Sequence, residues 1–232
     1  RQTVAVCRLC RYREHSMNFN EIANGSVIML SGDSVTDAGR AYPTGTYRTG
    51  LGGGYVNRMH EIITAAYPEK KIKIVNKGIS GETSRQVAAR WLADLEEVKP
   101  DYATLMIGVN DVWRSYDAYL EPGIAVSADE YEKNLRFILE NTKTLKGFML
   151  ISPIFFELNR EDTFMKRIIE YSGICKRLAD EYGVAYCDLQ PEIDRLSSAI
   201  YTTTFSGDRV HPGPVACMAI AREVLRHMNF NF

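Results

Sequence analysis

The 232-residue chain lacks the features that mark membrane and nucleic-acid-binding proteins. No apolar run approaches the roughly 18 residues that a membrane span requires. No block of basic residues interleaved with aromatics occurs in the body of the chain, and 28 Lys and Arg nearly balance 29 Asp and Glu. We therefore expect a soluble globular protein with no membrane span and no nucleic-acid partner, and a homo-oligomer stays open.

The chain also lacks a disulfide framework and a signal peptide. Its five cysteines form an odd, scattered set: Cys7, Cys10, Cys175, Cys187 and Cys217. Such a set fits reduced thiols, so we expect a cytoplasmic protein, with export only if a leader was removed. Cys7 and Cys10 have the spacing of a metal pair, but no second pair follows at zinc-site distance.

The first 24 residues differ from the rest of the chain. They are polar and Arg-rich, without sustained periodicity, and the chain does not begin with Met. We expect residues 1–24 to be disordered or contributed by an expression vector, with Met17 as a candidate natural start. Residues 25–232 then form one domain, because two domains would each be unusually small.

Short apolar runs alternate with helical periodicity after residue 25. The strands are expected at 27–31, 72–75, 102–107, 148–151 and 184–187. The helices are expected between Tyr55 and Pro68, between Thr83 and Pro100, from Ser127 to about Lys143, at Glu161–Glu181 and at Val215–Met228, with mostly loop between 188 and 212. This alternation predicts a three-layer α/β/α sandwich around a five-stranded parallel sheet, with the ligand at the carboxyl ends of the strands.

Ser34 is the candidate nucleophile. It follows a buried-strand pattern directly, after Gly32 and Asp33, so its hydroxyl would lie where the chain turns out of the sheet. Ser34 could instead only cap a turn, and Ser31 and Ser80 are rival nucleophiles. Ser31 lies within the strand end, however, and the sequence around Ser80 lacks the glycine spacing of an α/β-hydrolase elbow.

Two further groups of residues could join Ser34. Asp208 and His211 are three residues apart, close enough for the carboxylate to bind one ring nitrogen, although alone they could be a loop salt bridge. Gly78 and Asn110 each follow a predicted strand, and a parallel sheet would bring both to the same edge as Ser34.

In these segments the chain resembles the SGNH hydrolases, also called the GDSL esterase and lipase family, from Val27 to Met228. The matching motifs are Gly32-Asp33-Ser34, Gly78, Gly108-x-Asn110-Asp111 and Asp208-x-x-His211. The resemblance implies a flavodoxin-like fold and a serine esterase with Ser34 as nucleophile. It also implies His211 as general base and then acid, and Asp208 as the group that orients the imidazole. The oxyanion hole would comprise the N–H of Ser34, the N–H of Gly78 and the side-chain amide of Asn110, with no cofactor and no metal.

The substrate that we expect is a small-molecule or carbohydrate ester with a short acyl group, acetyl above all. The runs 36–40 and 110–114 look like those of the family's carbohydrate acetylesterases. Substrate contacts are predicted for Asp33, Arg40, Tyr42 and Trp113, because aromatic faces beside polar side chains suit a sugar ring.

Several alternatives remain at this point. They are a lipase or thioesterase for longer acyl chains, a non-catalytic sugar-binding protein, and a nucleotide- or flavin-binding module, which the lack of a Gly-rich phosphate loop disfavours. The chain also departs from the family after Pro212, where Gly213-Pro214 follows instead of the Gly-His pair of many relatives. Asp33, Asp37 and Asp111 could hold a cation, but capping and loop hydrogen bonds are the favoured interpretation.

Overall fold

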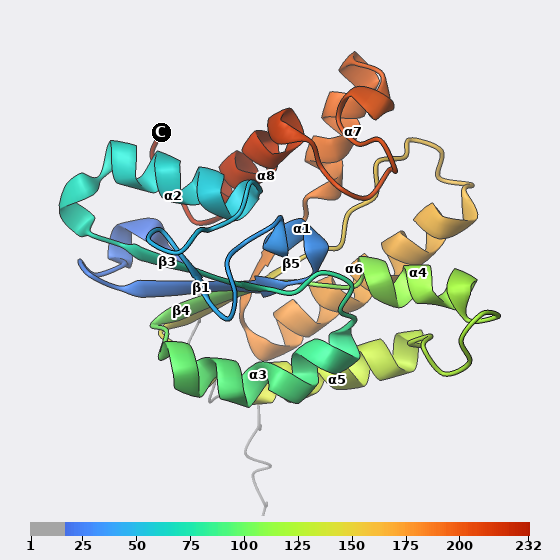
Figure 1. The fold of residues 1–232 in the computed structure, drawn as a ribbon, viewed down its shortest axis with the longest axis horizontal. Coiled ribbons are helices and arrows are strands. Elements are labelled where there is room, and N and C mark those ends of the chain that lie inside the picture. The colour runs from blue at the N-terminus through green and yellow to red at the C-terminus, as the bar shows by residue number, and fades with distance from the viewer. Residues whose placement is uncertain (1–16) are drawn as a thin grey trace, which may run out of the picture.

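The computed structural model describes residues 17–232, which form a three-layer α/β/α sandwich (Figure 1). The strands are β1 (Val27–Gly32), β2 (Gly45–Thr46), β3 (Lys73–Gly78), β4 (Tyr102–Met106), β5 (Gly147–Ile151) and β6 (Ala185–Cys187). The helices are α1 (Ser34–Asp37), α2 (Tyr55–Ala66), α3 (Ser84–Val98), α4 (Val109–Asp117), α5 (Ala128–Glu140), α6 (Thr163–Tyr182), α7 (Gln190–Ala199) and α8 (Pro214–His227).

The sheet has the order β2-β3-β1-β4-β5-β6, and all neighbours from β3 to β6 are parallel. This arrangement confirms the predicted fold class. The prediction of five strands missed β2, which pairs antiparallel with β3 at the edge. Two residues within a loop rich in Gly, Thr and Tyr carry no periodicity from which a strand could be recognised.

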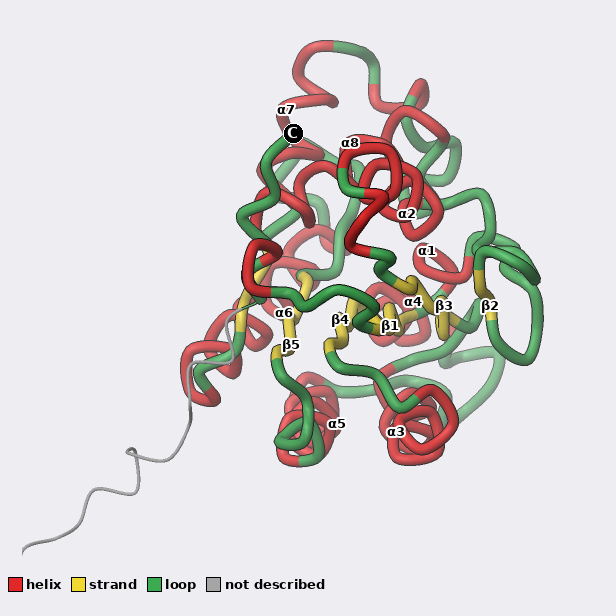
Figure 2. Tube along the Cα trace, turned by 90° about the vertical axis from the view of Figure 1, so that its left-hand side faces the viewer, coloured by secondary structure: helices red, strands yellow, loops and turns green. Residues whose placement is uncertain are grey.

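Helices cover both faces of the sheet (Figure 2). One core lies under α2, α7 and α8, and the other lies under α3, α5 and α6. Alternate residues of β1 reach the two sides: Ile28 and Leu30 join the first core, whereas Met29 joins the second. Burial on both faces explains why the strands read as continuous apolar runs.

The predicted helices begin and end at the residues that cap them. Thr83 forms a capping box with Gln86 at the start of α3, and the Ser127 side chain accepts a hydrogen bond from the Glu130 N–H at the start of α5. At the end of α6, Gly183 has a left-handed backbone with φ of 64°. Helix α7, however, lies in the stretch that we expected to be mostly loop. Of its buried residues Gln190, Ile193 and Ser197, only Ile193 is apolar, so the sequence shows little helical periodicity there.

The expected boundary near residue 25 is wrong for the described part of the N-terminal stretch. Met17, Phe19 and Ile22 are buried in the first core, and the Phe19 N–H donates to the carbonyl of Met228 at 2.6 Å. The ring of Phe19 also packs edge-on against Phe230. The domain therefore includes residues from 17 onward, whereas residues 1–16 lie outside the described part.

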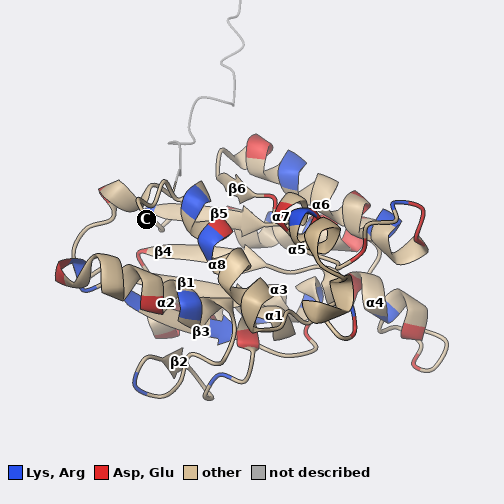
Figure 3. Ribbon diagram, turned by 90° about the horizontal axis from the view of Figure 1, so that it is seen from above, with Lys and Arg blue, Asp and Glu red and all other residues tan. Residues whose placement is uncertain are grey.

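The cysteines and the charged residues are arranged as the composition led us to expect. Cys175, Cys187 and Cys217 are free and buried, as expected of reduced cysteines, whereas Cys7 and Cys10 lie outside the described residues. Charged residues of both signs are interspersed over the helices (Figure 3). Within residues 17–232, no helix combines the length and the apolar character that a membrane crossing requires.

Candidate active site

Ser34 is the first residue of α1, at the carboxyl end of the central strand β1. The preceding glycine is needed for close packing, because a Cβ on Gly32 would lie 2.3 Å from the carbonyl oxygen of Met106. Asp33 then starts the helix, since its Oδ1 accepts a hydrogen bond from the Val35 N–H at 3.0 Å. The half-buried Ser34 hydroxyl is thereby held at the rim of the sheet, with its own N–H at the open first turn of a helix.

The structure brings Ser34, His211 and Asp208 together. Ser34 Oγ lies 2.8 Å from His211 Nε2, and His211 Nδ1 lies 2.5 Å from Asp208 Oδ2. An ionised carboxylate only accepts hydrogen bonds, so Nδ1 carries a proton and Nε2 is left to accept the Ser34 proton. Side chains from two segments distant in sequence therefore form a relay in which the serine can be deprotonated.

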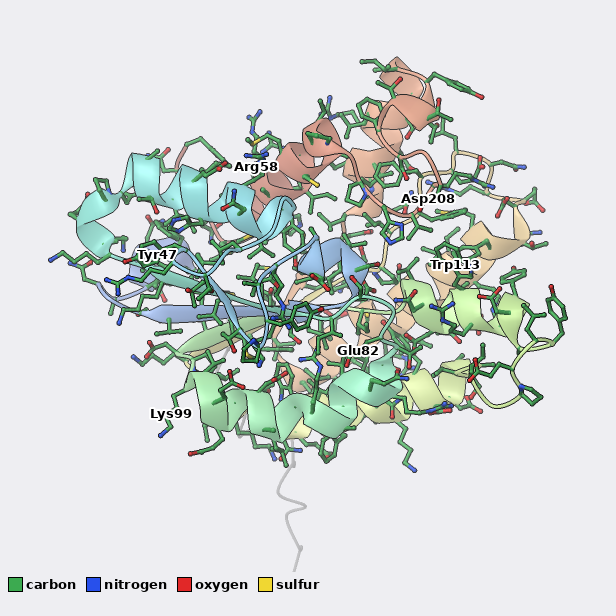
Figure 4. All side chains as sticks on the ribbon, in the orientation of Figure 1. Tyr47, Arg58, Glu82, Lys99, Trp113 and Asp208 are labelled. Atoms are coloured by element: carbon green, nitrogen blue, oxygen red, sulfur yellow. The ribbon has the colours of Figure 1, made fainter. Side chains whose placement is uncertain are left out.

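Asp208 is held in its ionised form. Burial raises the pKa of its carboxyl group, but hydrogen bonds from the side chain and N–H of His211 and the N–H of Val210 outweigh it, so the pKa lies well below the usual value. The Asp208 and His211 side chains are 45% and 46% exposed, so the relay opens to solvent. Figure 4 labels Asp208 beside Trp113 at this end of the sheet.

The loop that carries Asp208 and His211 is anchored by Arg209, which has a left-handed backbone with φ of 68°. Its carbonyl accepts a hydrogen bond from the Phe156 N–H at 2.8 Å, and its guanidinium lies over the ring of Phe155. The same guanidinium pairs with Glu157 and, at 2.9 Å, with Asp162. These contacts fasten the loop that carries Asp208 and His211 to residues 155–162.

Asn110 is the second residue of α4 and is 4% exposed. One hydrogen of its side-chain amide is donated to the carbonyl of Glu82 at 2.9 Å. An amide nitrogen carries two hydrogens, so a second donor remains for a ligand. The position after the end of a strand agrees with the role that the family resemblance implied for Asn110.

Gly78, in contrast, cannot serve as the oxyanion donor that we expected. Its N–H donates to Oδ1 of Asn76 at 2.9 Å, and its carbonyl accepts from Arg40 Nε at 2.6 Å. A Cβ at this position would lie 2.3 Å from the backbone nitrogen of Asp37. Gly78 is buried where β3 packs against α1, and its lack of a side chain serves that packing.

Gly81, which sequence reasoning missed, has the open N–H. It is exposed with φ of 83°, and no acceptor among the described residues lies against its N–H. Its neighbours are fixed: the N–H and hydroxyl of Ser80 donate to Asp37, and the Glu82 carbonyl accepts from Asn110. The sequence signal was a second glycine three residues after Gly78, but pattern alone does not show which N–H stays free.

Two of the four predicted substrate contacts are contradicted. Asp33 is 1% exposed, and burial raises its pKa to about 7. Arg40 is 3% exposed, and its Nη1 donates to the carbonyls of Ala41 and Pro43, both at 2.8 Å. Both side chains make hydrogen bonds within the protein: Asp33 caps helix α1, and Arg40 holds the loop that follows it.

The two aromatic candidates remain accessible. Trp113 lies on α4, not in a loop as predicted, and its ring centre is 6.4 Å from that of His211. The indole ring also lies nearly perpendicular to the ring of Phe164, with the ring centres 6.5 Å apart. Tyr42 is 57% exposed, but its hydroxyl donates to Asp37 at 2.6 Å and its ring lies against the guanidinium of Arg40.

The three carboxylates near this edge accept hydrogen bonds, as the favoured interpretation predicted. Asp33 caps α1, Asp37 accepts from Ser80, and Asp111 accepts from the N–H of Ser84 at 2.9 Å. Burial raises the pKa of Asp111 to about 6. Over residues 17–232, no group of three His, Cys, Asp or Glu side chains is placed to hold a metal ion.

The chain is similar to known ester hydrolases. Residues 30–216 match the model of the GDSL-like Lipase/Acylhydrolase family. An acetylxylan esterase of Geobacillus stearothermophilus is 39% identical over 214 residues, which cover 91% of this chain and 98% of the relative. Its crystal structure aligns with a TM-score of 0.87 over 90% of this chain and 97% of that chain.

Two further comparisons bear on the site. Variants of that esterase in which a serine, an aspartate or a histidine is replaced by alanine are described as catalytic mutants, and the aspartate and histidine are three positions apart, as Asp208 and His211 are. The thioesterase 1/protease 1/lysophospholipase L1 of Escherichia coli is 28% identical over 117 residues, half of each chain. This chain belongs to the GDSL-like lipase/acylhydrolase family and is a serine ester hydrolase.

Proposed function

We propose that the enzyme removes short acyl groups, acetyl in particular, from carbohydrate hydroxyls. The observation that carries this proposal is the Ser34–His211–Asp208 relay, with separations of 2.8 and 2.5 Å, at a solvent-exposed rim beside Trp113. An open rim admits a bulky sugar, and an indole face can stack on its ring. The likeness to an acetylxylan esterase over nearly the whole chain supports the same substrate class.

The arrangement supports the following reaction. Ser34 Oγ attacks the ester carbonyl while His211 Nε2 takes its proton, and Asp208 stabilises the charged imidazole. The oxyanion that forms accepts hydrogen bonds from the N–H of Ser34, the N–H of Gly81 and the free amide hydrogen of Asn110. His211 then returns the proton to the departing alcohol.

The acyl-enzyme is cleared by water. His211 deprotonates a water molecule, which attacks the acyl carbon through a second oxyanion held by the same donors. Ser34 leaves with its proton restored, and the free acid is released. Water is the second substrate, and the groups that move the protons and hold the oxyanion belong to this chain.

Acyl esters of 4-nitrophenol with two, four and eight carbons test the acyl preference. We expect kcat/KM to fall at least tenfold from acetate to octanoate, with no turnover by Ser34→Ala. A preference for octanoate would contradict the proposal and favour a lipase or thioesterase.

Acetylated xylo-oligosaccharides test the sugar preference, with release of acetate as the measurement. Trp113→Ala should raise KM for the oligosaccharide more than KM for 4-nitrophenyl acetate, because only the sugar stacks on the indole. Equal changes in the two KM values would argue against a stacking role. Without acetate release by the unmodified enzyme, the carbohydrate assignment fails although esterase activity stands.

A further inference from the structure

Arg90 of α3 is ion-paired with Glu82, the residue that follows the oxyanion donor Gly81. Its Nε donates to the Glu82 carboxylate at 2.7 Å, and the two side chains are each 15% exposed. Figure 4 labels Glu82 on the turn that precedes α3. Neither side chain has a part in the proton transfers described above.

Glu82 connects both oxyanion donors that lie outside α1. It follows Gly81 directly, and its carbonyl accepts the side-chain amide of Asn110 at 2.9 Å. A shift of Glu82 therefore moves the Gly81 N–H and the Asn110 amide together. On the other side of Gly81, Ser80 is already tied to Asp37 of α1 through two hydrogen bonds.

The same guanidinium also reaches β1, the strand that ends just before the nucleophile. Arg90 Nη2 donates to the carbonyl of Gly32, two residues before Ser34, at 3.4 Å. Arg90 Nη1 pairs with Asp94, which in turn accepts from Lys77 of β3 at 3.0 Å. A planar guanidinium with several fixed donors can hold such separate acceptors in one geometry, whereas an ammonium cannot.

We propose that Arg90 and Glu82 are positioning residues that hold the Gly81 N–H and the Asn110 amide at the distance from Ser34 that the oxyanion requires. This inference rests on the proposed serine esterase reaction. Burial raises the pKa of Glu82 above its usual value, and the charge and hydrogen bond of Arg90 offset part of that rise, so loss of Arg90 would make the ionised carboxylate less favourable. Loss of Arg90 leaves Glu82 without this partner and its turn free to shift.

The test compares Arg90→Gln with Arg136→Gln, which removes an arginine paired between α5 and α6, away from the site. Hydrolysis of 4-nitrophenyl acetate by Arg90→Gln should lose at least fivefold in kcat, with KM changed less than threefold. Complete loss of one oxyanion donor costs on the order of 10²- to 10³-fold, so a displaced donor should cost less. Inactivation by diethyl 4-nitrophenyl phosphate, whose phosphoryl oxygen uses the same donors, should slow in parallel.

Two Glu82 variants test whether the contact with Arg90 is what positions the donors. Glu82→Gln keeps a side-chain oxygen that accepts from Arg90 and should retain kcat within threefold, whereas Glu82→Ala should lose at least fivefold. If Arg90→Gln does not fold, the two Glu82 variants decide alone. A loss below fivefold in folded Arg90→Gln, or in Glu82→Ala, overturns the inference, as does a loss that Arg136→Gln shares. No hydrolysis by the unmodified enzyme would instead contradict the esterase function itself.

Discussion

Replacing Asp33 by asparagine should make stability less dependent on pH. The Asp33 side chain is 1% exposed, and burial raises its pKa from 3.8 to about 7, with the charge of Asp111 acting in the same direction. Asparagine keeps a carbonyl oxygen that can accept the Val35 N–H, so the start of α1 should be preserved. Ionisation of residue 33 is then the main property that the substitution removes.

The direction in which the free energy of unfolding changes with pH follows from the protons bound by the folded and unfolded states. Between about pH 4 and pH 7 the folded protein holds a proton on Asp33 that the unfolded chain has released, so the free energy of unfolding falls as pH rises. One unit of pKa shift corresponds to about 1.4 kcal/mol, so this carboxyl lowers stability by about 4 kcal/mol once pH exceeds 7. Between pH 5 and pH 8, the advantage of Asp33→Asn over the unmodified protein should grow by about 3 kcal/mol.

Urea unfolding at pH 5, 6, 7 and 8, followed by circular dichroism, measures this difference. Asp162→Asn is the matched control, because Asp162 also caps a helix. There, burial raises the pKa, but hydrogen bonds from the Met165 N–H and Arg209 lower it below its usual value. Its ionisation therefore contributes no slope between pH 5 and pH 8. The reasoning is refuted if the free-energy difference between Asp33→Asn and the unmodified protein stays constant over that range.

Four further substitutions test the site. Ser34→Ala should abolish hydrolysis of 4-nitrophenyl acetate and leave the urea midpoint nearly unchanged; retained turnover would exclude Ser34 as nucleophile. Asn110→Ala should lower kcat by on the order of 10²- to 10³-fold, because one oxyanion donor is lost. Stopped-flow measurement of the acylation rate checks this, and a loss smaller than tenfold would contradict the role of Asn110. Gly78→Ala should lower the free energy of unfolding by about 3 kcal/mol through overpacking against α1. Gly81→Ala, with its nearest neighbour 3.8 Å away, should cost about 1 kcal/mol through its backbone alone, so greater destabilisation by Gly81→Ala would contradict the assignment of the two glycines.

The positions that are set by local chemistry could be predicted from the sequence. An apolar run followed by Gly32, Asp33 and Ser34 requires a strand that ends in a turn, and the turn places the hydroxyl at the rim. The spacing of Asp208 and His211 lets one side chain reach the other within a single loop, and their 2.5 Å contact agrees with that expectation. Capping at Thr83 and Ser127 was likewise predictable, because each cap involves residues three positions apart.

Predictions failed where the fate of a polar group depends on a segment distant in sequence. Arg40 sits in a loop with the composition of a binding site, yet it is buried because the carbonyl of Gly78, 38 residues away, accepts its Nε. Trp113 was predicted in a loop, because α4 has only nine residues and its buried face includes the polar side chains of Asn110 and Asp111. Met17 and Phe19 belong to the domain only because Phe19 packs against the far end of the chain.

The sequence by itself determined the order of the five parallel strands and of the five longer helices α2, α3, α5, α6 and α8. It also determined the serine at the end of the first strand and the Asp-His pair in the final loop, because each depends on neighbours within a few residues. Only the tertiary structure decided that Ser34 and His211 meet at 2.8 Å, that Gly81 and not Gly78 keeps a free N–H, and that Arg90 pairs with Glu82, the residue after Gly81. The physical reason is that a backbone N–H is available to a ligand only if no packed segment supplies an acceptor. Which segments pack together is a property of the whole fold.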